Sequence, residues 1–511
     1  MSNDGETGRM ETIGDECNAT KARVAWRRDD IAIDLVTFLL MLWPLAINGA
    51  PFYSDDSSSY LRGGAFGFET GLSMLSEWWE SIVGGPPVGS VVDGLSVAGP
   101  ASDSSQAIVQ TAIAEAGGVR SVIYSVLTYI LRAPGSSLLA LAIVQAGAVT
   151  VIISFLRRLI LPGTALWTGM AIGAGVAFLT SAAWYAAYAM ADIFAGVMVG
   201  GALILTVFFD RLGTPARILL VLLVAIGATT HDSHLPVALA TLMAGAAAHF
   251  WLQRVPPRRL VKQSIWFVSP LVLAVVALFA TSLLAFGETS LAPKRYPILL
   301  ARSVADGPGA WHLRENCATE RYAICEVLGS QPPRDIGDFL WGAEGVRNQA
   351  SPEQMERIRA EEATIIRRAA MDYPLVQIGL SARNMVAQFF KLGLTGLPFG
   401  QTLVGTADPI LTQTAPDRPG IKFAFEIVIY AGFFGSLALL LYFRREIRKV
   451  EFAAVAVALA GLLANAAVCG ILSAVTDRYQ GRVAWILSSL ALLILLRVAF
   501  DRRRRSNNAT A

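Results

Sequence analysis

The chain has 511 residues, of which 54% are hydrophobic and 16% are charged, and its formal net charge is +3. Soluble domains carry about 25% charged residues, so this composition excludes an ordinary soluble protein. The small positive charge lies in short loops and at the C-terminus, and the sequence has no recognisable nucleic-acid-binding module. We therefore expect an all-α membrane protein that crosses the bilayer many times and binds no nucleic acid.

Ten apolar segments approach the roughly 20 residues that a helix needs to cross about 30 Å of hydrocarbon. One nearly uninterrupted apolar stretch, from Leu161 to Phe209, is about twice that length and must turn between Ser181 and Asp192. This turn is expected to place Asp192 at a surface. The predicted spans are residues 31–50, 135–156, 162–181, 192–209, 216–231, 235–252, 265–286, 422–443, 452–473 and 483–500.

Lysine and arginine gather at alternate ends of these spans and, in the ten-span topology, fall on one side of the membrane. By the positive-inside rule that side is the cytoplasm, so both termini are expected there. About thirty mostly polar residues precede the first span, which predicts that it is retained and not cleaved as a signal peptide. The basic groups lie at 27–28, 157–158, 211–217, 258–262, 444–449 and 502–505.

This topology divides the chain into five parts. Two outer connections are far longer than a turn requires, and long loops on a rigid scaffold commonly carry function. The parts are a cytoplasmic tail (1–30), a seven-span bundle (31–286) with a long first outer loop (51–134), an outer segment (287–421), a three-span bundle (422–500) and a basic cytoplasmic tail (501–511).

The outer connections carry helical signals and two cysteines. The apolar run from Val119 to Leu131 is too short to span, which indicates an interfacial or re-entrant helix. In the outer segment, Ser351 with the capping-box residue Gln354 predicts the start of a charged helix. Cys317 and Cys325 share this segment, and an oxidising exterior favours a disulfide between them over two free thiols.

An acidic pair follows the first span directly. Asp55 and Asp56 lie a few residues beyond the outer boundary, where a carboxylate can act on a lipid-borne substrate. Two adjacent acids in a partly desolvated cleft separate in pKa, which suits one as a general base and the other as an orienting group or metal ligand. The alternative is a polar turn that ends the helix. Asp192, at the outer entry to the fourth span, is a third candidate, with helix capping as its alternative.

A tight outer turn after the fifth span contains His231, Asp232 and His234. The two histidines have the spacing of metal ligands, and Asp232 would be a third ligand. Histidines in a polar turn are more often capping or hydrogen-bonding groups, so we assign a polar site here and no metal.

Two arginines, Arg478 and Arg482, stand four residues apart at the start of the last span. The helix dipole is already positive there, so the pair is unfavourable unless an anion is present. A phosphate is the natural anion, because a guanidinium donates two parallel hydrogen bonds to it. The alternative is snorkelling to lipid phosphates in general. Lys294 and Arg295, just after the seventh span, are candidates for the same basic cluster.

These features together resemble the GT-C superfamily of integral-membrane glycosyltransferases, which includes protein mannosyltransferases, lipid A aminoarabinose transferases and bacterial arabinosyltransferases. The shared layout is an inside N-terminus, a long first outer loop with an acidic pair after the first span, interfacial helices in that loop, and a further outer acid. The resemblance implies that Asp55 or Asp56 is the catalytic base and that Asp192 matches the second acidic position approximately. The chain departs from better-known members in its modest outer segment and in lacking a C-terminal soluble domain.

The resemblance also implies the partners and the location. The donor is expected to be a sugar on a polyprenyl phosphate, and Arg478 and Arg482 would stabilise the departing phosphate. The acceptor would be an envelope glycan, lipid or protein at the outer face of a bacterial inner membrane, among membrane lipids. A divalent cation is not required by the sequence, and its participation stays open together with the donor sugar and the acceptor.

Two other functions fit parts of the pattern. Ligases or polymerases of the O-antigen type also have a large outer loop, but they rely on its arginines and histidines, and here that loop has only His312. Transporters of lipids or solutes usually carry their polar groups near mid-membrane on broken helices and have short loops. In this chain the ionisable groups gather at the outer ends of spans.

Overall fold

The computed structural model describes residues 27–83, 121–132, 137–253, 257–404 and 410–510. Most of the predicted cytoplasmic tail (1–30) and part of the first outer loop lie outside these residues. The described chain is almost entirely helical, with one two-stranded hairpin. It therefore fits an all-α, multi-pass membrane protein.

The helices fall into three groups along the chain. The first group is α2 (Arg28–Met41), α3 (Trp43–Asn48), α4 (Asp55–Val83), α7 (Val122–Leu131), α8 (Leu139–Ile160), α9 (Leu166–Leu179), α10 (Ala182–Ala186), α11 (Ile193–Val207), the 3₁₀ turn η1 (Phe209–Arg211), α12 (Thr214–Thr229), α13 (His234–Gln253) and α14 (Pro257–Phe286). The second is α15 (Ile298–Asp306), α16 (Pro308–Glu320), α17 (Ala323–Leu328), α18 (Ile336–Trp341), α19 (Val346–Gln349), α20 (Pro352–Asp372) and α21 (Pro374–Phe389), followed by strands β1 (Gln401–Val404) and β2 (Ile410–Gln413). The third is α22 (Pro419–Tyr442), α23 (Lys449–Leu472) and α24 (Asp477–Thr510).

Within the described residues, seven helices are long and apolar enough to cross a membrane. They coincide with seven of the ten predicted spans. The other three predictions correspond to shorter apolar helices: α9 has 14 residues, α11 has 15 and α12 has 16. At 1.5 Å per residue these reach about 21–24 Å, less than the thickness of the hydrocarbon core. Every residue of α11 is buried, so this helix forms the centre of the bundle and meets α8, α12, α13, α23 and α24.

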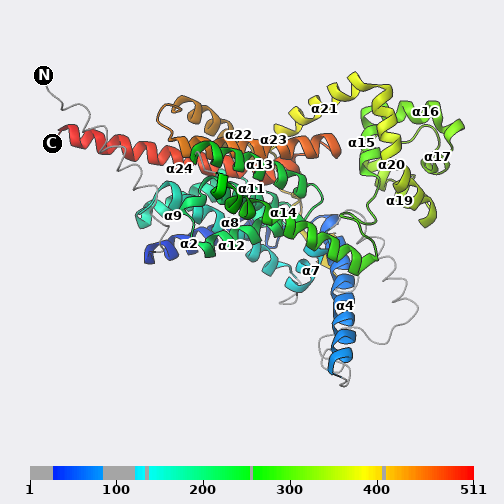
Figure 1. The fold of residues 1–511 in the computed structure, drawn as a ribbon, viewed down its shortest axis with the longest axis horizontal. Helices are drawn as coiled ribbons and strands as arrows, with labels where there is room; N and C mark the ends of the chain where they lie inside the picture. The colour runs from blue at the N-terminus through cyan, green and yellow to red at the C-terminus, as the bar shows by residue number, and fades with distance from the viewer. Residues whose placement is uncertain (1–26, 84–120, 133–136, 254–256, 405–409, 511) are drawn as a thin grey trace.

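One end of the bundle is closed by buried ion pairs. Arg157 on α8 bonds Asp30 and Asp34 on α2, at 2.8 and 3.3 Å. Arg497 on α24 bonds Glu451 on α23. This end holds the start of α2 and the last turns of α24, whereas α15–α20 lie at the opposite end (Figure 1). Following the predicted topology, we call the end that carries α15–α20 the outer end. The predicted basic tail (501–511) continues α24 as helix as far as Thr510.

Helices α15–α20 of the outer segment build a core of their own. Its buried residues come from all six of these helices and the chain before them, and include Leu300, Leu313, Ile324, Phe339 and Ile358. The predicted capping box is confirmed, because the Ser351 hydroxyl accepts from the backbone N–H of Gln354 and the Gln354 side chain accepts from that of Ser351. Cys317 and Cys325 are joined by a disulfide.

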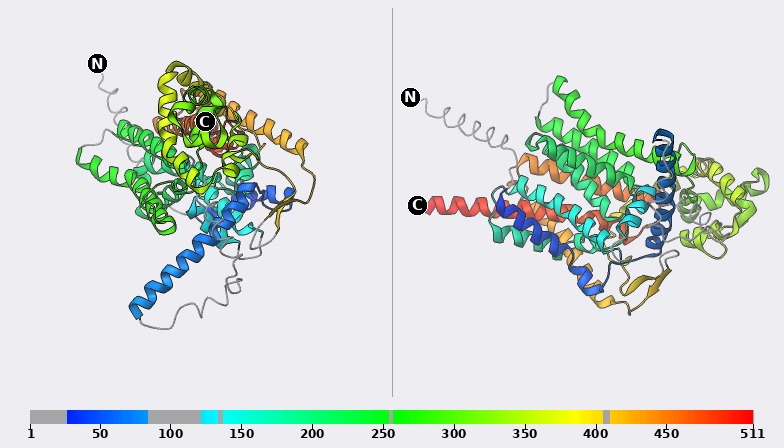
Figure 2. Two further views of the ribbon diagram at one scale, coloured as in Figure 1. Left: turned by 90° about the vertical axis from the view of Figure 1, so that its right-hand side faces the viewer. Right: turned by 90° about the horizontal axis from the view of Figure 1, so that it is seen from below.

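Helix α4 departs most from the sequence prediction. The acidic pair was expected at the end of a span or in a polar turn, but it opens a helix of 29 residues. This helix projects sideways from the outer end of the bundle (Figure 2). It packs on α7, the predicted interfacial helix, and a Cβ added at Gly64 would collide with the Ser125 carbonyl oxygen. Gly64 and Gly67 therefore allow α4 to pack closely on α7.

Candidate active site

A cavity of about 490 Å³ opens at the outer end of the bundle. Four separate parts of the chain form it: the start of α4, the turn before α11, the segment from α21 through the β1–β2 hairpin, and the turn between α23 and α24. Its lining residues are Ser54, Asp55, Tyr188, Thr395, Gly396, Pro398, Gln401, Leu411, Ala474, Thr476, Arg478 and Tyr479. One acidic and one basic side chain thus line a largely apolar space that also holds three hydroxyls, an amide and two tyrosine rings.

The acidic pair is fixed by backbone pairing with a distant turn. Phe52 N donates to Ala187 O at 2.9 Å, and Ala189 N donates back to Phe52 O at 2.9 Å. The hydroxyl of Ser57, in the first turn of α4, donates to Ala189 O at 3.0 Å. These bonds hold the start of α4 against the turn that leads into α11. The partial positive charge of a helix N-terminus favours carboxylates, so the location suits Asp55 and Asp56.

The two acids have different surroundings. Asp55 is exposed and lines the cavity. Asp56 is partly buried and accepts from Arg478 Nη1 at 3.0 Å. Arg478 also lines the cavity, and its Nε lies 3.7 Å from Asp192 Oδ1. A single guanidinium therefore joins the acid after the first span to the acid before α11.

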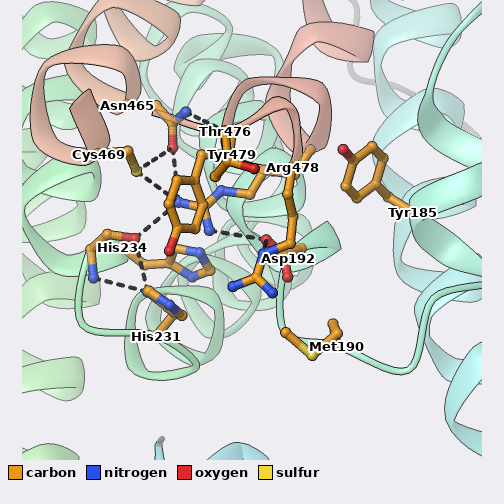
Figure 3. A network of polar contacts seen from close by, with 12 residues as sticks. Tyr185, Met190, Asp192, His231, His234, Asn465, Cys469, Thr476, Arg478 and Tyr479 are labelled. Carbon is orange, nitrogen blue, oxygen red and sulfur yellow. Dashed lines mark hydrogen bonds and ion pairs between the residues drawn. The ribbon is translucent and has the colours of Figure 1, made fainter. Parts of the chain in front are cut away.

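Arg482 does not reach the cavity. It is completely buried, and its Nη1 donates to Asp192 Oδ1 at 3.2 Å. Its Nη2 lies 2.9 Å from Ser233 Oγ, 3.1 Å from Asn465 Oδ1 and 3.3 Å from Cys469 Sγ. In Figure 3, Asp192 lies at one side of this network, and Asn465 and Cys469 lie at the other. The predicted contact with a donor phosphate does not fit this position, because Arg482 is fully buried and does not line the cavity, although its Nε has no hydrogen-bond partner among the described residues. Arg482 is the counter-ion of Asp192.

Asp192 itself also differs from the prediction. It was expected at a surface, but only 2% of it is exposed. Its Oδ1 accepts a hydrogen bond from Arg482 and lies near Arg478. Its Oδ2 is buried with no hydrogen-bond partner among the described residues. Its side chain does not cap α11. The nearby Tyr188 lines the cavity, and burial raises the pKa of Tyr188 to about 12, so this hydroxyl stays protonated at neutral pH.

The histidine turn serves the same network. His234 is buried, and its Nδ1 lies 3.0 Å from Thr230 Oγ1 and 2.9 Å from Gly227 O. Ser233 Oγ accepts a hydrogen bond from Arg482 and lies 2.9 Å from His231 Nδ1. Among the described residues, no group of three or more His, Cys, Asp or Glu side chains is arranged to hold a metal ion. The turn therefore acts as a support for Arg482.

Asp232 belongs to the same turn, and its side chain is exposed. Desolvation by nearby protein atoms raises the pKa of Asp232 to about 6, and the charge of Arg295 partly opposes the shift.

Lys294 and Arg295 lie apart from Arg478. Lys294 pairs with Glu288 and, at 3.7 Å, with Glu356. Arg295 pairs with Glu362 at 3.0 Å. Their charges are thus matched by acids of the outer segment. Neither residue lines the cavity, so the predicted basic cluster is reduced to Arg478.

Sequence reasoning missed the polar residues that complete the site. Asn465 lies within the span α23, and its amide nitrogen donates to Tyr479 O at 2.6 Å and to Gln480 Oε1 at 2.9 Å. A polar side chain in the middle of an apolar helix is a signal for this role that the sequence did contain. Thr395 and Gln401 gave no such signal, because they lie in loop and hairpin regions that are polar for ordinary reasons.

No protein-family model, curated protein or solved structure matches this chain. The chemistry of the cavity must therefore be argued from its residues. It presents an exposed carboxylate and a guanidinium to the same space, which suits removal of a proton at one side and stabilisation of an anion at the other.

Proposed function

We propose that the protein is an integral-membrane glycosyltransferase of the GT-C type. It moves a sugar from a polyprenyl-phosphate-linked donor to an envelope acceptor on the outer face of the bacterial inner membrane. The observation that carries the proposal is that Asp55 and Arg478 face one cavity at the outer end of a helical membrane bundle. The ten-span topology with both termini in the cytoplasm belongs to the same proposal.

The reaction assigns one role to each of these groups. An acceptor hydroxyl oxygen attacks C1 of the donor sugar and forms a new C–O bond, while the bond from C1 to the phosphate oxygen breaks. The hydroxyl proton passes to the Asp55 carboxylate, which acts as general base. The electron pair leaves with the polyprenyl phosphate, and the Arg478 guanidinium stabilises its negative charge. A phosphate is a good leaving group, so no strong general acid is required.

Three further residues hold Arg478 in position. Asp56 bonds it directly at 3.0 Å, Asp192 lies 3.7 Å from its Nε, and Arg482 pairs with the same Asp192 carboxylate at 3.2 Å. Asp56, Asp192 and Arg482 are therefore positioning residues. This division favours Asp55 over Asp56 as the base, because the carboxylate of Asp56 is already engaged by Arg478.

The lining of the cavity also suits a sugar. Tyrosine rings such as Tyr188 and Tyr479 pack against the apolar face of a pyranose or furanose ring, while Thr395 and Gln401 bond its hydroxyls. The O-antigen-ligase alternative requires a histidine at the site, and no histidine is among the residues that line this cavity. His312 is buried in the outer segment, 2.7 Å from Asp372 Oδ2, and is not a lining residue.

The test is donor turnover in membranes. Vesicles that contain the full chain receive a panel of radiolabelled polyprenyl-phosphate hexoses and pentoses together with an envelope extract as acceptor, and loss of label from the lipid is measured. Asp55→Asn should abolish turnover at unchanged abundance. Glu69→Gln, an exposed acid on the same helix, is the matched control and should retain it. Full turnover in Asp55→Asn would remove Asp55 as the base; no turnover of any donor by the native chain would favour transport.

A further inference from the structure

Helix α21 exposes an apolar stripe that the proposed function does not use. Leu375 is 83% exposed, Ile378 66%, Val386 51% and Phe390 48%. Spacings of three, eight and four residues place all four on one face of the helix, with Ala382 in the gap. A helix of an ordinary outer loop would turn such a face inward.

The opposite face of α21 is polar and buried. Asn384 Nδ2 donates to both carboxylate oxygens of Asp306, at 3.0 and 3.2 Å. Gln388 exchanges two hydrogen bonds with the backbone of Thr476, at 2.8 and 2.9 Å. A Cβ at Gly470 of α23 would lie 2.7 Å from Asn384 O, so the packing is close. These contacts fix the rotation of α21, and its apolar side must face outward.

The C-terminal end of α21 meets the side of a spanning helix. The Phe389 ring lies 6.1 Å from Phe433, and the Phe390 ring stacks at 6.0 Å on Phe434. Phe434 is fifteen residues after Pro419 in α22, which is about 22 Å along that helix. Phe434 is 40% exposed, and two apolar residues nearer the outer end, Ile427 (54%) and Phe423 (65%), are more exposed. The stripe is therefore continuous with the exposed apolar side of a helix that is long and apolar enough to span.

We propose that α21 enters the bilayer from its outer face, with its exposed stripe against lipid acyl chains. Phe390 lies deepest and Leu375 lies nearest the headgroups. An inverted helix, polar inside and apolar outside, is stable only where the surroundings are apolar. Arg383, exposed one turn above Val386, is placed to reach the headgroup phosphates. This inference is independent of the proposed function.

The location has a consequence for the cavity. The chain leaves α21 at Phe390 and passes within a few residues to Thr395, Gly396 and Pro398, which line the cavity. Lys391 and the backbone N–H of Gly393 both bond Asp477 at the start of α24. One wall of the cavity would thus rise directly from a membrane-embedded helix, on the side from which a lipid-borne molecule arrives.

The test is fluorescence quenching on the full chain reconstituted in phosphatidylcholine vesicles. Single cysteines for an environment-sensitive dye are introduced at Ile378→Cys and Val386→Cys in a Cys17→Ser background, where Cys469 is buried and Cys317–Cys325 is oxidised. Phe423→Cys on α22 is the lipid-facing control, and Arg367→Cys, exposed on α20, is the water-facing control. Nitroxide groups on the acyl chains and aqueous iodide are the two quenchers.

We expect both α21 positions to be quenched by acyl nitroxides like Phe423→Cys, with a shallower nitroxide preferred at Ile378→Cys. Quenching by iodide like Arg367→Cys would overturn the proposal. So would protection from both quenchers, which would mean that a second copy of this chain covers the stripe. Because labelling can disturb folding, the unmodified chain is also photolabelled with a diazirine phospholipid. Label in the α21 peptides is expected, and its absence there with label in α22 would contradict the proposal.

Discussion

Arg482 Nη1 lies 3.2 Å from Asp192 Oδ1, and both side chains are almost completely buried where α24 packs on α11. A buried ion pair is stable only as a pair, because removal of one partner leaves an uncompensated charge. Arg482→Met should therefore lower stability by about 3–5 kcal/mol. Thermal denaturation in detergent measures this. The double variant Arg482→Met with Asp192→Asn should regain part of the loss, and a double variant no more stable than the single would contradict the pairing.

Arg478 offers a separate test of anion stabilisation. In Arg478→Ala the cavity loses its guanidinium, and transfer should fall by about 10²–10³. Arg478→Lys keeps the charge but cannot bond Asp56 and approach Asp192 together, so its loss should be smaller yet clear. Initial rates at matched abundance decide the matter. Rates within a factor of two of the native chain in Arg478→Ala would exclude Arg478 from the reaction.

Most of the bundle could be predicted from the sequence because lipid imposes one simple rule. A span must be apolar and about 20 residues long, and among the described residues the rule found all seven helices that meet it. The rule failed for helices that are surrounded by protein and not by lipid. Helix α11 is completely buried within the described bundle, so its 15 residues need not match the bilayer, and Asp192 at its start is buried and not at a surface.

The sequence proposed candidate residues for a site but could not give their geometry. Arg478 contacts Asp56 and Asp192, and Asp55 lines the same cavity as Arg478. Arg482, four residues along the same helix, is instead buried beside Asp192 and does not line the cavity. Helix α4 was missed because its glycines read as a loop, whereas Gly64 and Gly67 lie in close contact with α7. Such roles depend on long-range packing, which a local pattern does not contain.

Asp232 predicts a pH-dependent stability. Its raised pKa, about 6, means that the folded chain holds this proton more tightly than the unfolded chain, whose value is about 4. As the pH rises from about 4 to 6, the contribution of Asp232 lowers the free energy of unfolding, and this decrease is complete above pH 6. Asp232→Asn should therefore match the native chain near pH 4 and exceed it at pH 7, by about 1 kcal/mol once solvent screening is allowed for. A variant less stable at pH 7 would mean that the carboxylate is stabilised by Arg295.

The disulfide should stabilise the outer segment and leave the bundle unaffected. Cys317 and Cys325 are eight residues apart, and closure of so short a loop contributes about 2–3 kcal/mol in the chain-entropy model. Cys317→Ala with Cys325→Ala should accelerate proteolysis within α15–α20, whose core is separate from that of the bundle. Limited proteolysis with mass spectrometry locates the cuts. Equal loss of protection in α8 or α11 would show that the two cores unfold together.

Asp56→Asn separates positioning from catalysis. The variant keeps the Asp55 carboxylate in the cavity but weakens the 3.0 Å contact that holds Arg478. Transfer should fall less than in Asp55→Asn, and the acidic limb of its pH profile should remain, because that limb reports the general base. Asp55→Asn should lose the limb together with the activity, since general-base removal costs about 10²–10⁴ in rate. If instead Asp56→Asn abolished the limb and Asp55→Asn retained it, the two roles would be exchanged: Asp56 would be the base, released from Arg478 when the donor phosphate arrives.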